Sequence, residues 1–101
     1  MYLIMRSTTK YGSRDQQRPE IMCHGDFKSL LIPRLCDEVE RSLTPDAELY
    51  VRIPGSGEEK ISPADNMYGL ISAIDRGCTH VIVDVPGGYS SYRVHFAIEE
   101  I

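Results

Sequence analysis

Alternating apolar and polar positions predict four strands in this chain. Leu49, Val51 and Ile53 alternate with polar neighbours over 47–53, which is typical of a half-buried strand. The turn chemistry of 54–57 leads into 58–61, which can return as a short antiparallel strand. The remaining two strands are predicted over 2–6 and, with the strongest pattern, over 79–85.

Apolar residues at helical spacing predict two helices between these strands. The first is marked by Leu31, Leu35, Val39 and Leu43, which recur every four residues. Its start is open: either Asp26 caps a long helix that passes through Pro33, or Pro33 lies in the first turn. The second begins near Ser62-Pro63-Ala64-Asp65 and ends at Arg76-Gly77, with its apolar face formed by Met67, Leu70, Ile71 and Ile74.

Two segments lack a clear pattern. Residues 7–20 are polar and aperiodic, so 7–26 is predicted as a long loop inserted into a single domain over 1–101. Residues 90–101 fit a helix through Val94, Ala97, Ile98 and Ile101, or a strand through Tyr92, Val94, Phe96 and Ile98. Ser90-Ser91 as a cap favours the helix, although Glu99-Glu100 oppose its dipole.

The predicted order is therefore β-α-β-β-α-β-α. It indicates an α+β fold of the open-faced β-sandwich kind, with a four-stranded, mostly antiparallel sheet and helices on one face. The 101 residues, 42% apolar and 26% charged, suit one compact domain. No apolar run is long enough for a membrane span, and no signal-peptide pattern is visible, so a cytoplasmic protein is expected.

Charge and cysteine content restrict the chemistry. A net charge of −4 argues against nucleic-acid binding. Residues 1–34 nevertheless hold six basic and three acidic residues, which fits either a solvated loop or a surface for an acidic partner. Three cysteines without CxxC spacing predict neither a disulfide framework nor a metal site, and no cofactor is indicated. Only Cys23 has a notable neighbour, His24.

The succession of motifs over about 30–101 resembles HPr, the histidine-containing phosphocarrier family of the bacterial phosphotransferase system. The residues similar to those of the family run from Asp46-Ala47-Glu48-Leu49 through Gly57 to Asn66-Met67-Tyr68-Gly69-Leu70. They continue through Gly77, Val81 to Val85 and Gly87 to the Phe96-Ala97-Ile98-Glu99-Glu100 end. The resemblance implies the four-stranded fold above and contacts with phosphotransferase-system enzymes or their targets. The family's regulatory serine corresponds to Asn66; nearby Ser62 is explained by helix capping.

The family's phosphoacceptor does not carry over directly. If Pro33 matches the proline of the family's His-x-Arg-Pro motif, Leu30 stands at the histidine and Ile32 at the arginine, so no acceptor remains. The alternative acceptor is His24, which would sit over a helix N-terminus with Lys28 or Arg34 supplying a cation. Asp26 beside it would repel a phosphate.

The first functional hypothesis is therefore a regulatory or protein-binding module with its phosphoacceptor lost or displaced. The alternatives are an active phosphocarrier using His24, which would be its only enzyme-like chemistry, and a structural or assembly protein that shares the fold. The oligomeric state is left open. The predicted docking surface lies on the two helices and comprises Leu30, Leu31, Ile32, Met67, Tyr68, Leu70 and Ile71.

Overall fold

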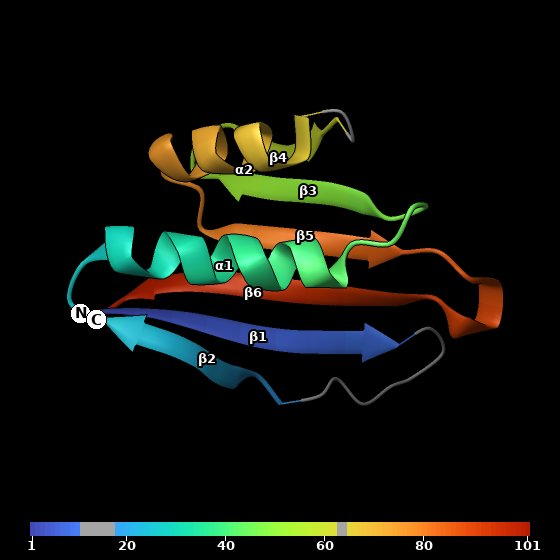
Figure 1. Cartoon of the computed structure of the whole chain (residues 1–101), viewed down its shortest axis with the longest axis horizontal. Helices are drawn as coiled ribbons and strands as arrows, with labels where there is room; N and C mark the ends of the chain where they lie inside the picture. Colours follow the sequence, from blue (N-terminus) through green and yellow to red (C-terminus); the bar gives the residue numbers. More distant parts are fainter. Residues whose placement is uncertain (11–17, 63–64) are drawn as a thin grey trace.

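The computed structural model describes residues 1–10, 18–62 and 65–101 (Figure 1). In this part of the chain, six strands form one antiparallel sheet in the order β2-β1-β6-β5-β3-β4. The strands are β1 (Tyr2–Lys10), β2 (Glu20–Gly25), β3 (Glu48–Ile53), β4 (Gly57–Ile61), β5 (His80–Val85) and β6 (Tyr92–Glu100).

Two helices, α1 (Lys28–Ser42) and α2 (Asn66–Asp75), lie on the same face of this sheet (Figure 1). Helix α1 packs against β1 and β2, and α2 packs against β3 and β4. A short 3-10 turn, η2 (Gly88–Ser90), connects β5 to β6. Neither α1 nor α2, the helices of the described part, is long and apolar enough to cross a membrane.

The core lies between the helices and one face of the sheet. Leu31, Leu35 and Val39 of α1 meet alternate strand residues that are almost fully buried. These strand residues include Val81 and Val83 of β5 and Val94 and Phe96 of β6. Because side chains alternate along a strand, the residues between them point to the face without helices.

The C-terminal segment is a strand, and the helix favoured for 90–101 is wrong. Strand β6 lies between β1 and β5 and pairs with β1 along its whole length, from Tyr92↔Lys10 to Glu100↔Tyr2. Val94 and Phe96 are buried, as the period of two requires. Two flanking ladders satisfy the backbone of β6, and its aromatic and β-branched residues favour a strand. The two ladders and the strand-favouring residues outweigh the weak helix-cap signal at Ser90-Ser91.

The four-stranded β-α-β-β-α-β-α order is also wrong, although the α+β class is right. The observed order is β-β-α-β-β-α-β-β. The span 7–26, predicted as a loop, contains the second half of β1 and all of β2, while 11–17 lie outside the described residues. Ser7, Thr8 and Thr9 are polar yet pair with β6. Ser7 and Thr9 lie on the side of the sheet that faces solvent, whereas Thr8 lies beside Val94 on the helix side.

The helix ends follow the sequence in part. Helix α1 begins after Phe27, with neither Asp26 nor another side chain capping it, and Pro33 lies inside it rather than in its first turn. Helix α2 ends as expected at Gly77, whose φ of 88° is a conformation that glycine adopts easily. The Gly77 amide donates to the Ile74 carbonyl, and the Cys78 amide donates to Ala73, both at 3.0 Å. Pro63 and Ala64 of the predicted start lie outside the described residues.

Candidate functional site

The sheet face that α1 and α2 leave uncovered carries a cluster of paired polar side chains. We call it the open face. The strand register brings its side chains together in rows: Arg52 lies beside His80, Ile82 beside His95, and Asp84 beside Arg93. The open face comprises Glu48, Tyr50, Arg52, His80, Ile82, Asp84, Arg93, His95 and Thr9.

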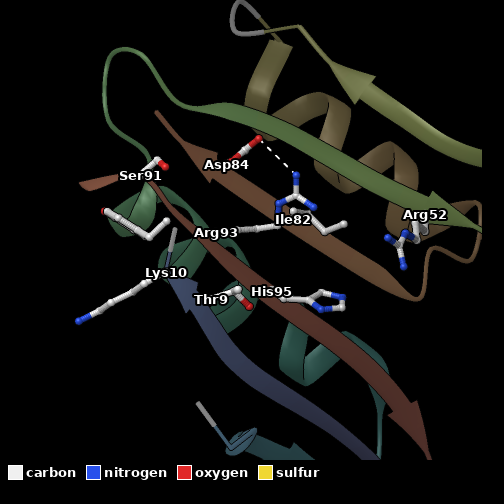
Figure 2. Close-up of a pocket in the computed structure, with 9 residues that line it drawn as sticks. Thr9, Lys10, Arg52, Ile82, Asp84, Ser91, Arg93 and His95 are labelled. Atoms are coloured by element: carbon white, nitrogen blue, oxygen red, sulfur yellow. Dashed lines mark hydrogen bonds and ion pairs between the residues drawn. The ribbon is translucent and has the colours of Figure 1, made fainter. Parts of the chain in front are cut away.

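A shallow depression of about 470 Å³ lies on the open face (Figure 2). Its lining includes three cationic side chains, Lys10, Arg52 and Arg93, and a single carboxylate, Asp84. Figure 2 shows Arg52 on the β3 side of the depression and Lys10 at the end of β1. The depression is thus positively charged, although the whole chain has a net charge of −4.

The floor of the depression is apolar. Ile82 is only 2% exposed but does not belong to the core on the helix side of the sheet. Its cross-strand neighbours on the open face are Tyr50 of β3 and His95 of β6. This arrangement places the surrounding polar groups partly out of water, where charges interact more strongly than in bulk solvent.

Two histidines of the open face contact one another directly. His80 Nδ1 and His95 Nε2 lie 2.9 Å apart, and the ring centroids are 5.0 Å apart with the planes tilted by 38°. At this distance one ring nitrogen donates a hydrogen bond and the other accepts it. At least one of the two rings is therefore neutral.

The surroundings of both rings oppose protonation. Burial lowers the pKa of His80, as does the nearby charge of Arg52, while Glu99 acts in the opposite direction. Burial also lowers the pKa of His95, and His80, Arg52 and Arg93 add to this effect. Since both values fall below the usual value of about 6.5, the pair is mostly neutral at pH 7.

The cations of the depression differ in their partners. The Arg93 guanidinium lies 3.4 Å from an Asp84 carboxylate oxygen (Figure 2). Arg52 has no carboxylate within ion-pair distance in the described part of the chain, and the same holds there for Lys10. Arg52 therefore offers a full positive charge beside the histidine pair.

On the β3 and β4 side of the open face, the polar side chains pair with one another. The Tyr50 hydroxyl donates to a Glu48 carboxylate oxygen, and Lys60 Nζ lies 3.2 Å from the other oxygen. The hydrogen bond from Tyr50 lowers the pKa of Glu48, and the same bond raises the pKa of Tyr50. These groups satisfy each other. Among the described residues of the open face, Arg52 is a cation without an ion pair, and Glu58 of β4 lies directly across from it in the strand register.

The predicted phosphate-binding residues do not converge. His24 is exposed on β2 and pairs with Leu3, a register position on the face opposite to α1. Lys28 and Arg34, its predicted supports, lie on α1 itself. Phosphorylation of His24 stays a prediction, which intact mass measurement after incubation with phosphoenolpyruvate and the general phosphotransferase enzyme would check.

The predicted helical docking surface is divided by burial. Leu31 and Leu70 belong to the core, and Ile32 and Met67 are partly buried against it. Leu30, Tyr68 and Ile71 are exposed, with Tyr68 at 83%. Only these three of the seven residues are available to a partner.

Sequence reasoning missed the open-face residues Arg52, His80, Arg93 and His95. The only signal was the alternation over 47–53, 79–85 and 92–98, which assigns these residues to one face of each strand but not to one another. The described residues contain no group of three or more side chains suited to a metal ion. All three cysteines are free, and burial raises the pKa of Cys23, which disfavours its reactive thiolate.

Comparison of the chain with protein-family models, with curated proteins and with solved structures finds no match. The comparisons therefore do not bear on the resemblance to HPr. The four-stranded fold that this resemblance implies differs from the six-stranded sheet of this chain.

Proposed function

We propose that this protein is a binding module that recognises an acidic segment of a partner protein on its open face. The observation that carries the proposal is that Arg52, which has no ion pair among the described residues, lies in a depression lined by two further cations and one carboxylate. Within the ranges that the structure describes, neither Arg52 nor Lys10 has an ion-paired carboxylate that an acidic ligand would have to displace. Arginine is well suited to this role because its planar guanidinium can bind a carboxylate through two hydrogen bonds.

The separation of the cations favours an extended segment over a single small anion. Arg52 on β3 and Lys10 on β1 are separated by β5 and β6, that is, by three strand spacings. At about 4.8 Å per spacing they stand roughly 14 Å apart across the sheet. The register places Arg52 level with Met5, so Lys10 also lies five residues, or roughly 16 Å, further along the strands. The combined separation of roughly 22 Å is a length that about seven extended residues cover. A nucleic-acid backbone would extend beyond the depression over a surface whose overall charge is −4 and would be repelled there, whereas a short acidic segment can stay within reach of the cations.

A binding experiment with a capped octa-aspartate peptide tests the proposal. We expect amide and side-chain NMR shifts at Arg52, Ile82 and His95, with weakening as salt is added because the attraction is electrostatic. Arg52→Gln should lower the affinity at least about fivefold, which corresponds to about 1 kcal/mol.

The matched control is Arg41→Gln. Arg41 is an exposed arginine of α1, on the other layer, and its removal changes the net charge equally. Equal losses in the two variants, or shifts confined to the helices, would contradict the proposal. Tighter binding of a single-stranded oligonucleotide would do so as well.

The resemblance to HPr implies phosphotransferase-system enzymes as partners, and the same NMR titration with those enzymes tests this. We also propose that the protein resides in the cytoplasm.

A further inference from the structure

We infer that binding of the acidic segment is coupled to proton uptake by the His80–His95 pair, so that the protein binds its partner more tightly at pH 6.0 than at pH 7.5. This inference rests on the proposed function, because it concerns regulation of the same face. It depends on the direct 2.9 Å contact between the rings and on their position beside Arg52.

The charged groups near the pair come from four strands. Glu58 of β4 lies across from Arg52 and lines a hollow together with Arg52 and His80. Arg52 of β3 lies directly beside His80 in the strand register. Arg93 and Glu99 belong to β6, and Asp84 of β5 is engaged by Arg93. On the β1 side, the cross-strand neighbours Ser7 and Thr9 are uncharged. Burial is the largest cause that lowers the pKa of each ring; Arg52 adds to it at both, and Glu99 opposes it at His80.

A bound carboxylate would reverse this balance. An anion seated on Arg52 offsets the positive charge felt by both rings and adds an attractive charge of its own. An opposite charge within a few ångströms favours the protonated form of histidine, so the pair takes up a proton from the solvent. By linkage, a ligand that raises the proton affinity of a site is itself bound more tightly when that site is protonated.

The pairing of the rings limits the uptake to one proton. After protonation of one ring, its N–H can still donate to the neutral nitrogen of the other ring, so the 2.9 Å contact is retained. A second proton would leave no acceptor and would place two like charges in contact. We therefore expect uptake of up to one proton per bound ligand rather than two.

Calorimetric titration with the capped octa-aspartate peptide tests the inference. Aspartate side chains stay ionised between pH 6.0 and 7.5, so a change in affinity reports on the protein. We expect binding about tenfold tighter at pH 6.0, in line with uptake of up to one proton. Titration in two buffers of different ionisation enthalpy should give an uptake above zero and no greater than one.

Two variants assign the effect. The double variant His80→Gln, His95→Gln should bind with similar affinity at both pH values, whereas His24→Gln should keep the pH response. His24 is exposed on β2 and is separated from the pair by β1. If the double variant does not fold, imidazole NMR of the unsubstituted protein still decides, because the peptide should raise the pKa of His80 or His95.

The outcomes separate the two claims. Binding of equal strength at pH 6.0 and 7.5, without proton uptake, overturns the coupling but leaves the binding module standing. An absence of binding at both pH values overturns the proposed function and this inference with it. A pH response that persists in the double variant also overturns the coupling.

Discussion

Phe96 illustrates how strongly a single side chain anchors this sheet. It is 0% exposed on β6 and lies beside Val81 of β5 in the strand register. Truncation removes a large apolar group from a close-packed site and leaves a cavity. We expect Phe96→Ala to lower the free energy of unfolding by about 3–5 kcal/mol, measured by urea denaturation.

The control for this prediction is Tyr68→Ala. Tyr68 is an aromatic residue of α2 that is 83% exposed, so its loss should change stability by no more than about 0.5 kcal/mol. Phe96→Leu keeps most of the apolar volume and should cost less than Phe96→Ala. Similar costs for Phe96→Ala and Tyr68→Ala would show that β6 is not the centre of the core.

At the residue scale, the sequence predicts burial better than it predicts the site. Leu35, Val39 and Leu70 are visible as core positions because each belongs to a local periodic pattern. His80 and His95 are 15 positions apart and meet only through the register of β5 and β6. His24 is predicted as a phosphoacceptor because Gly25-Asp26 and a possible helix start follow it, and this local pattern is unrelated to the open face.

Helix α2 approaches β4 so closely that Gly69 has no room for a side chain. A Cβ at this position would lie 2.6 Å from Cγ2 of Ile61, itself a buried residue of β4. Alanine would gain about 1 kcal/mol of helix propensity, but it would force the helix and the strand apart. We expect Gly69→Ala to destabilise the fold by about 1–3 kcal/mol in chemical denaturation.

The control on the same helix is Ser72→Ala. Ser72 is exposed, so the substitution improves helix propensity without a steric conflict and should leave stability equal or slightly higher. If Gly69→Ala were as stable as Ser72→Ala, the close packing between α2 and β4 would be refuted.

At the element scale, the strands were hardest to predict where the sheet is most central. The hairpin of β3 and β4 was predicted because alternation and turn residues are local. Strand β6 shows two competing periods, and only the ladders with β1 and β5 decide between them. The second half of β1 carries no apolar signal, because Ser7 and Thr9 lie on the open face and Thr8, beside Val94 on the helix side, is polar as well; the pattern therefore predicts a loop.

At the scale of the whole molecule, the two ends of the chain pair with one another. The Ile101 amide donates to the Met1 carbonyl at 2.8 Å, and β1 and β6 run side by side (Figure 1). Strand order depends on such pairings between distant segments, which no local pattern encodes. This explains why the α+β class could be predicted from the sequence while the six-stranded order could not.

Stability of the whole domain should depend on pH through the same histidines. The pKa values of His80 and His95 are lower in the folded protein than the usual value of about 6.5 for an exposed histidine. The unfolded chain therefore binds more protons between the folded and unfolded values, and stability rises with pH across that window. The full contribution is present above about pH 6.5 and is lost as pH falls through the folded values. Glu48, whose pKa is also lowered, adds a further loss at more acidic pH.

Urea denaturation at pH 7.5 and 5.5 checks this dependence, with a lower free energy of unfolding expected at pH 5.5. The double variant His80→Gln, His95→Gln should reduce the difference, because the chain then has no half-buried imidazoles to protonate. His24→Gln, at the exposed histidine of β2, should keep the difference close to that of the unsubstituted protein. A difference that is unchanged in the double variant would mean that groups other than the pair control acid stability.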